Sequence, residues 1–193
     1  PRIILLSATV GDTTAAEHWL RPCETIKVTE RTPPLNKHIL QLREDEVAEE
    51  VILTWAKEVL SQAADNQILI FVYQTRSAEK LSRIMNKETP GDLASYYHSK
   101  TSNAHRSQVK SDFSSGKLRV VVTTTSLAMG INLPTTHVLV RDLTFAGPAQ
   151  NPGISDILQM MGRAGRGDVE GHAYALLKPG DSWTLDELKH QLE

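Results

Sequence analysis

Short apolar runs alternate with helical patterns along most of this chain, and this alternation limits the folds that it can adopt. The apolar runs, which predict buried strands, are Ile39–Leu42, Ile68–Val72, Leu93–Tyr97, Leu118–Thr123, Val138–Val140 and Ala173–Leu177. The segments with apolar side chains at helical spacing are Glu44–Ala63, Ser77–Lys87, Ser102–Ser115, Ser155–Arg163 and Leu185–Leu192. Such alternation predicts an α/β fold with a mainly parallel sheet and helices on both faces. The carboxyl ends of the strands then lie at one edge, where ligands usually bind.

The first thirty residues follow a different pattern. Glu30–Pro34 predicts a linker, because its paired prolines interrupt both helix and sheet. We therefore expect two units, residues 1–32 and residues 33–193. The chain does not begin with methionine, so we expect it to be part of a longer protein. The elements predicted before the linker are a strand, a short helix and a second strand, at Ile3–Leu6, Thr13–Leu20 and Thr25–Val28.

The composition excludes several classes of protein. The net charge is −2, with 21 basic and 23 acidic residues, so any nucleic acid must be bound by a local groove and not by a general basic field. The single cysteine, Cys23, excludes an internal disulfide and argues against a cysteine-rich zinc site; we expect it to be buried. No pair of histidines has metal-ligand spacing on a helix, so no bound metal is expected in this chain.

The segment Gln159–Arg166 carries the most specific chemistry of the sequence, Gln-Met-Met-Gly-Arg-Ala-Gly-Arg. On a helix, Gln159, Arg163 and Arg166 would fall along one face. Two planar guanidinium groups beside glycines suit a polyphosphate. The alternative is a surface helix end with two solvated arginines.

Small polar residues follow two of the predicted strands. Ser7-Ala8-Thr9 comes directly after the first apolar run, and Thr124, Thr125 and Ser126 continue the strand that ends at Thr123. Hydroxyls and free backbone N–H groups at the carboxyl end of a strand are well placed for phosphate oxygens. The alternative is a buried strand with a polar exit.

Taken in order, these segments resemble the motifs of superfamily 2 helicases. Ser7-Ala8-Thr9 resembles motif III, Phe71–Arg76 resembles motif IV, and Gln159–Arg166 resembles motif VI. Motif V is matched by the stretch from Thr124 to Gly130-Ile131-Asn132-Leu133-Pro134. The residues of motifs V and VI are similar to those of the superkiller-like DExH branch. Further matches between motifs IV and V are Tyr97, His98, Arg106, Phe113 and Gly116. The resemblance covers essentially the whole chain.

The resemblance implies a RecA-like three-layer sandwich. Helicases of this family enclose ATP between two such domains, and nucleic acid runs across both. Residues 1–32 resemble the tail of the first domain with the linker, and residues 33–193 resemble the second, helicase C-terminal domain. The chain lacks a Gly-x-x-x-x-Gly-Lys phosphate loop and an Asp-Glu-x-His box. ATP with its magnesium ion would therefore be bound mainly by the first domain.

The resemblance also implies a function and residue roles. The full-length protein would be an ATP-dependent helicase or translocase, and this chain alone would be inactive. Its partners would be single-stranded or partly duplex nucleic acid and the first RecA-like domain. The implied roles are catalysis by the arginine fingers Arg163 and Arg166 with Gln159; nucleotide binding by Gly162, Asn132 and Gly130; nucleic-acid contact by Thr124, Arg76, His98 and Lys100; and coupling by Ser7 and Thr9.

One loop departs from the family pattern. The branch often has His-x-Gly where this chain has His98-Ser99-Lys100, so a charged contact would replace a close backbone contact. The alternatives are a structural His98, a solvated Lys100 and a helix-start surface residue at Arg76.

Two other functions remain possible at this stage. One is an ATP-independent nucleic-acid or protein adaptor with a degenerate ATPase site. The other is a different nucleotide-binding α/β domain, which the absence of a glycine-rich loop after the first strand disfavours. No apolar run is long enough to cross a bilayer, so no membrane partner is expected. We expect a location inside the cell, in the cytoplasm, nucleoid or nucleus.

Overall fold

The computed structural model describes residues 4–5, 14–26, 33–89, 91–125, 133, 135–145, 151–165 and 168–193. The elements within them are, in chain order, α1 (Thr14–Trp19), β1 (Leu35–Gln41), α2 (Ala48–Gln62), β2 (Ile68–Val72), α3 (Thr75–Glu88), β3 (Ala94–Tyr97), α4 (Asn103–Ser114), β4 (Val120–Thr124), β5 (His137–Val140), α5 (Ile154–Met161), β6 (Gly171–Leu177) and α6 (Leu185–Leu192). Among these residues, every helix is too short or too polar to cross a bilayer.

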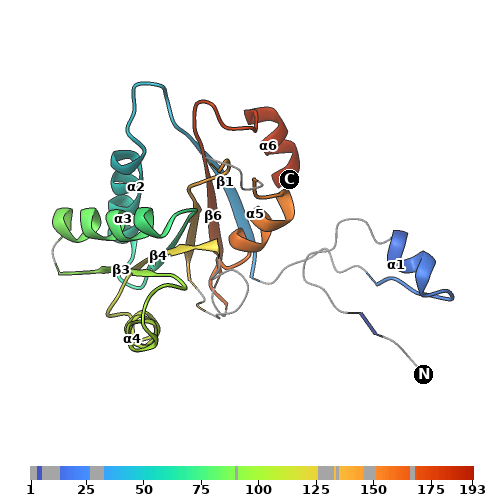
Figure 1. Ribbon diagram of the computed structural model, residues 1–193, viewed down its shortest axis with the longest axis horizontal. Coiled ribbons are helices and arrows are strands. Elements are labelled where there is room, and N and C mark those ends of the chain that lie inside the picture. Colours follow the sequence, from blue (N-terminus) through green and yellow to red (C-terminus); the bar gives the residue numbers. More distant parts are fainter. Residues whose placement is uncertain are drawn as a thin grey trace.

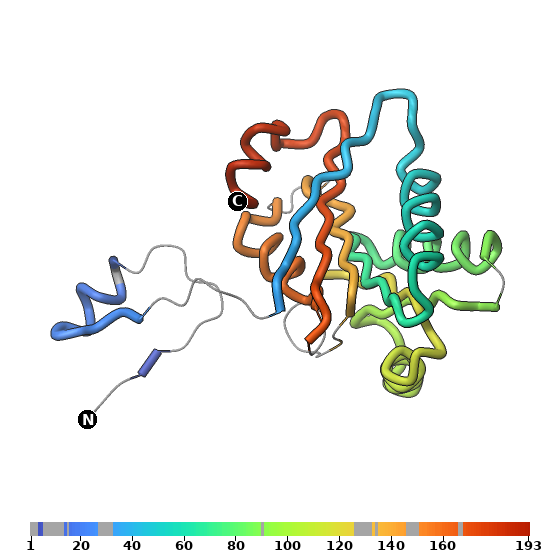
Figure 2. Tube along the Cα trace, turned by 180° about the vertical axis from the view of Figure 1, so that it is seen from behind, coloured from blue at the N-terminus to red at the C-terminus, as the bar shows by residue number. Residues whose placement is uncertain are grey.

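The described strands form one sheet in the order β1-β6-β5-β2-β4-β3, and every neighbouring pair is parallel (Figures 1 and 2). The central strands β2 and β4 are buried along their whole length. Strands of a parallel sheet are buried in this way when helices cover both faces, and their sequences are then continuously apolar. The predicted α/β fold class is confirmed.

Helices cover the two faces of the sheet in unequal numbers (Figure 1). On one face, α2 and α3 pack with Ile70, Val122 and Leu139. On the other face, α4, α5 and α6 pack with Val121 and Val138. The sheet residues alternate between these two clusters, as the period of a strand requires. The result is the three-layer sandwich that the sequence predicts.

Most predicted elements agree with the structure to within a few residues, and two boundaries differ by four. β1 begins at Leu35, because its pairing with β6 continues through the polar residues Asn36–His38, which give no apolar signal. α2 begins at Ala48, not at Glu44. The residues before it close a turn, in which Glu46 accepts hydrogen bonds from the backbone N–H and the guanidinium of Arg43.

The described N-terminal residues, 4–5 and 14–26, lie apart from the sheet (Figure 1). The predicted short helix is confirmed as α1. Ile4, Leu5, Thr25 and Ile26 belong to no strand, so the two strands predicted there are wrong at these residues. A strand needs a neighbour for its backbone N–H and C=O groups, and the described sheet offers none to them. Cys23 is exposed, which corrects the expectation that it is buried.

Candidate functional site

Gln159, Gly162 and Arg163 lie together at the end of α5. The helix ends at Met161, and the N–H of Gly162 donates to the carbonyl of Leu158 at 2.8 Å. Arg163 follows the helix in a turn, where its N–H donates to the carbonyl of Met160 at 3.1 Å. The prediction that Arg163 continues the helical face of Gln159 is therefore wrong, because the chain leaves the helix there to join the sheet.

The residues after α5 are held against the amino edge of the sheet. Ala164 is fully buried and forms a parallel bridge with Thr135, whose carbonyl accepts the N–H of Gly165 at 2.8 Å. Gly171, the first residue of β6, lies so close that a Cβ atom there would come within 2.5 Å of the carbonyl carbon of Ala164. Real Cβ contacts are longer than this, so the close approach requires glycine. The sheet thus fixes the position of Arg163.

A buried polar cluster supports this attachment. The hydroxyl of Thr135 donates to the carbonyl of Gln67 at 2.6 Å, and the N–H of Gln67 donates to the hydroxyl of Thr136 at 2.9 Å. The side-chain amide of Gln67 donates to the carbonyls of Phe113 and Leu118 at 2.6 and 3.0 Å. Satisfied buried networks of this kind hold a unique arrangement. The amino edge is therefore a rigid base for the end of α5.

The groups at this end are suited to an anion. Gln159 and Gly162 are exposed and Arg163 is half-buried. An amide and a guanidinium donate hydrogen bonds that fit phosphate oxygens. Magnesium requires oxygen ligands, and within the described residues no group of three or more His, Cys, Asp or Glu side chains is arranged to hold a metal. The described residues at the end of α5 therefore offer hydrogen-bond donors that suit phosphate oxygens.

The predicted nucleic-acid residues lie at the opposite, carboxyl edge. Thr124 is the last residue of β4, Arg76 is the second residue of α3 after β2, and Lys100 follows β3. These three strands are neighbours in the sheet, so the residues that follow them share one part of the edge. Arg76 and Lys100 are exposed, and neither side chain has a hydrogen-bonding or charged partner among the residues described. Thr124 is buried at 7% exposure.

His98 differs from its neighbours at this edge, because it is only 3% exposed. Its Nε2 lies 3.2 Å from Oε1 of Glu79, and its ring stacks on Tyr96 with centroids 5.5 Å apart. Its Nδ1 is buried, with no partner among the described groups. Arg106 donates hydrogen bonds to Ser99 and Asn103 and so braces the loop that carries Lys100.

The structure therefore separates the predicted site residues into two groups at opposite edges of one sheet. Gln159, Gly162 and Arg163 form one group, and Arg76, His98, Lys100 and Thr124 form the other. The other predicted residues lie outside the described residues: Ser7, Thr9, Gly130, Asn132 and Arg166.

One further residue at the carboxyl edge, Asp142, was not predicted from the sequence. It is the second residue after β5 and is 9% exposed, and its carboxylate contacts the backbone N–H of Tyr73 and the ammonium of Lys178. The available signal was a charged Arg141-Asp142 pair immediately after the apolar run of β5. Charged residues are almost never buried unless they are paired, so a charged pair at the end of a buried strand indicates a residue held by specific partners.

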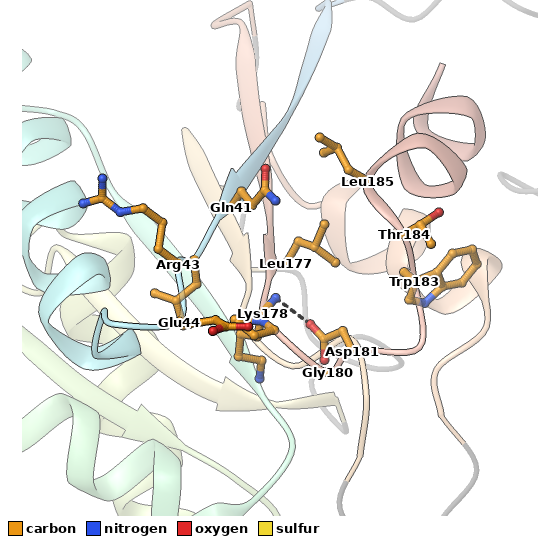
Figure 3. A pocket seen from close by; sticks show the side chains of 12 residues that line it. Gln41, Arg43, Glu44, Leu177, Lys178, Gly180, Asp181, Trp183, Thr184 and Leu185 are labelled. Atoms are coloured by element: carbon orange, nitrogen blue, oxygen red, sulfur yellow. Dashed lines mark hydrogen bonds between the residues drawn. The ribbon is translucent and has the colours of Figure 1, made fainter.

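A pocket lies at the carboxyl ends of β1 and β6 beside the start of α6 (Figure 3). Its walls include Arg43, Lys178 and Trp183, and the backbone N–H of Lys178 donates to Oδ2 of Asp181 at 2.8 Å. None of the residues predicted from the sequence lines it. The pocket is therefore separate from both groups of predicted residues.

Three histidines cross the amino half of the sheet on the face that carries α2. His38 of β1, His172 of β6 and His137 of β5 stack with ring centroids 5.8 and 5.0 Å apart. Burial and the charges of His172 and His38 lower the pKa of His137 to about 4. Burial and then the charge of His172 lower the pKa of His38. His137 and His38 are therefore preferred in their neutral forms.

Comparison with known proteins adds three observations. The helicase conserved C-terminal domain family matches residues 51–168. A probable ATP-dependent helicase of Methanocaldococcus jannaschii is 28% identical over 98% of this chain and 24% of its own length. The ATP-dependent DNA helicase Hel308 of Thermoplasma volcanium is 30% identical over 91% of this chain and 30% of its own length. The chain thus spans less than a third of either relative.

Among solved structures, S. cerevisiae Dbp5 bound to RNA and ADP BeF3 is similar, with a TM-score of 0.70 and 22% identity. The similarity covers 96% of this chain and 46% of that one. It confirms the RecA-like fold.

Proposed function

Because the chain belongs to the helicase conserved C-terminal domain family, we propose that it is the second RecA-like domain of an ATP-dependent helicase or translocase of the superkiller-like branch. The observation that carries the proposal is the family match over residues 51–168. That match includes the groups at both edges of the sheet, and the end of α5 within it is rigidly attached to the amino edge. The reaction would take place inside the cell, where ATP is supplied.

We propose further that residues 1–32 are the tail of the first RecA-like domain and the linker. Large apolar side chains are exposed there: Ile4 at 79%, Trp19 at 75% and Ile26 at 82%. Exposed apolar groups gathered in one segment mark a surface that another structure covers. Residues of the first domain would cover them and would supply the strand partners that these residues lack. Ser7 and Thr9 would then lie between the domains, where they could couple the two sites.

The nucleotide would bind between the first domain and the end of α5. ATP brings a triphosphate whose charge grows on the terminal phosphoryl group during hydrolysis. Arg163 and Arg166 would place guanidinium groups against that charge, Gln159 would orient the attacking water, and Gly162 would keep the approach open. Gly130 and Asn132 would contact the nucleotide from the motif V loop. Magnesium would be held by the first domain, since the proposed residues at the end of α5 include no carboxylate.

The nucleic-acid strand would cross the carboxyl edge. Arg76 and Lys100 are exposed cations without partners among the described residues, and Thr124 ends the strand between them. Groups of this kind bind the phosphate backbone and do not identify bases. His98 would support the Lys100 loop, because its ring is buried and its backbone carbonyl accepts hydrogen bonds from the N–H and the hydroxyl of Thr101. The relatives named above include a DNA helicase, so single-stranded DNA is the first substrate to test.

Salt titration of the full-length protein tests this assignment. Each lost phosphate contact on a single strand changes the slope of log K against log salt by about 0.7. We expect the double variant Arg76→Ala/Lys100→Ala to bind a single-stranded oligonucleotide more weakly, with a slope reduced by about 1.4, for every base sequence. Lys57→Ala, which removes an exposed lysine of α2, is the matched control and should leave both quantities unchanged.

Two results would contradict the proposal. One is an unchanged slope in the double variant, which would remove the carboxyl edge from the strand path. The other is a full-length protein that binds the oligonucleotide but does not hydrolyse ATP, which would favour the adaptor function.

A further inference from the structure

Asp142 joins the carboxyl ends of three neighbouring strands. It follows β5, and its Oδ2 accepts the backbone N–H of Tyr73, at the end of β2, at 2.8 Å. Its Oδ1 accepts a hydrogen bond from Nζ of Lys178, at the end of β6, at 2.7 Å, and Nε of Arg141 lies 3.3 Å away. A carboxylate buried to this extent is costly unless such partners hold it. Asp142 therefore fixes the relative positions of all three strand ends.

The chain segments that begin at Tyr73 and at Asp142 lead to the two proposed sites. Tyr73 leads directly into α3, on which Arg76 is the second residue. Asp142 begins the segment that leads to α5 and Arg163.

The two segments also touch beyond Asp142. The rings of Tyr73 and Phe145 stack with centroids 3.9 Å apart and planes 14° from parallel. The N–H of Phe145 donates to Oδ1 of Asn151 at 2.7 Å, just before α5 begins. Contacts thus connect the carboxyl edge, where nucleic acid would bind, with α5, whose end would contact the nucleotide. Asp142 is the acidic residue among them.

We infer that Asp142 is a positioning residue that couples nucleic-acid binding to ATP hydrolysis. This inference rests on the proposed function. A strand that binds Arg76 displaces the start of α3 and Tyr73, and the carboxylate and the ring stack transmit that displacement to the segment before α5. Asp142 itself contacts neither the strand nor the nucleotide. Its removal should therefore affect the stimulation of hydrolysis by nucleic acid more than the unstimulated rate.

The test uses the full-length protein and the substitution Asp142→Asn. Asparagine keeps an acceptor for the N–H of Tyr73 but has no charge for Lys178. ATP turnover is measured with and without a single-stranded oligonucleotide, together with the melting temperature. We expect the ratio of stimulated to unstimulated turnover to fall about fivefold or more, which is the lower range of measured couplings between sites. Asp112→Asn is the matched control, because Asp112 pairs with Lys117 at 3.5 Å far from this path, and its ratio should not change.

A second variant separates coupling from stability. In Asp142→Asn, the half-buried ammonium of Lys178 loses its carboxylate, which lowers stability. Asp142→Asn/Lys178→Met removes that ammonium and should recover part of the lost melting temperature, while the ratio stays low. If the ratio recovers with the melting temperature, Asp142 serves stability alone and the inference is overturned. Should the single variant fail to fold, the double variant alone decides.

The outcomes also separate this inference from the function on which it rests. A wild-type protein without ATP turnover contradicts the proposed function. A stimulated wild-type protein whose Asp142→Asn variant keeps the full ratio contradicts only the inference about Asp142.

Discussion

Among single residues, Gln159 and Arg163 at the end of α5 and Asp142 at the carboxyl edge of the sheet carry the proposed chemistry. Gln159 and Arg163 carry recognisable chemistry in a recognisable order, and the structure places both at the end of α5. Asp142 could not be identified in this way, because its role depends on Tyr73 and Lys178, which are 69 and 36 residues away in the chain. Contacts between such distant residues exist only once the strand order is known.

Gly171 gives a prediction at this scale. In Gly171→Ala, the added Cβ would lie 2.5 Å from the carbonyl carbon of Ala164, so the backbone after α5 would have to move. We expect the free energy of unfolding to fall by about 1–3 kcal/mol, as for other overpacked sites. ATP turnover of the full-length protein should fall with it, because the same backbone carries Arg163.

The melting temperature and turnover of the full-length protein check this expectation. The control is Gly153→Ala, whose Cβ would meet only Oδ2 of Asp156 at an ordinary 3.7 Å. Equal effects of the two substitutions on both quantities would show that the contact between Gly171 and Ala164 does not hold the segment in place.

At the scale of helices and strands, burial decided which elements were predictable. β2 and β4 are buried on both faces, so their apolar runs locate them to within two residues. The edge strand β1 carries Asn36, Lys37 and His38, and its first half is set by pairing with β6 and not by an apolar pattern. The end of α5 was misplaced for a related reason, since the bridge between Ala164 and Thr135 draws the chain out of the helix.

The buried His137 of β5 makes the stability of the sheet sensitive to acid. The pKa of His137 is lowered to about 4 in the folded chain, against an ordinary value of 6.5. Below pH 6.5 the unfolded chain therefore takes up a proton that the folded chain resists. The contribution of the neutral His137 to the free energy of unfolding is complete above pH 6.5. As pH falls towards 4, this free energy decreases by on the order of 3 kcal/mol.

Unfolding measured at pH 7 and at pH 5 tests this expectation. His137→Phe keeps a ring beside His172 but has no group that takes up a proton, so the loss of stability between the two pH values should be smaller. His190→Phe, at an exposed position of α6, is the control and should lose as much as the wild type. If His137→Phe loses as much stability as the wild type over this interval, the burial of a neutral His137 is not the cause.

At the scale of the whole molecule, the proposed account has two sites at opposite edges of one sheet. The end of α5, where the nucleotide would bind, is attached to the amino edge through Thr135 and Gly171. The proposed nucleic-acid residues follow the carboxyl ends of β2, β3 and β4. Neither group completes a site within the described residues. The chain spans less than a third of the helicases it resembles, so the remaining parts of both sites would come from the rest of such a protein.

If the segment after α5 supplies catalytic arginines to ATP, the decisive substitution in the full-length protein is that of Arg166. ATP turnover and melting temperature should be measured on one preparation each of the wild type, Arg166→Ala and Arg166→Lys. We expect turnover to fall about 10³-fold or more in both variants, because lysine cannot reproduce the planar guanidinium. Arg166 lies between two glycines, so its loss should change the free energy of unfolding by no more than roughly 0.5 kcal/mol. A lowered melting temperature with intact turnover per folded molecule would show that Arg166 stabilises the fold and does not act on ATP.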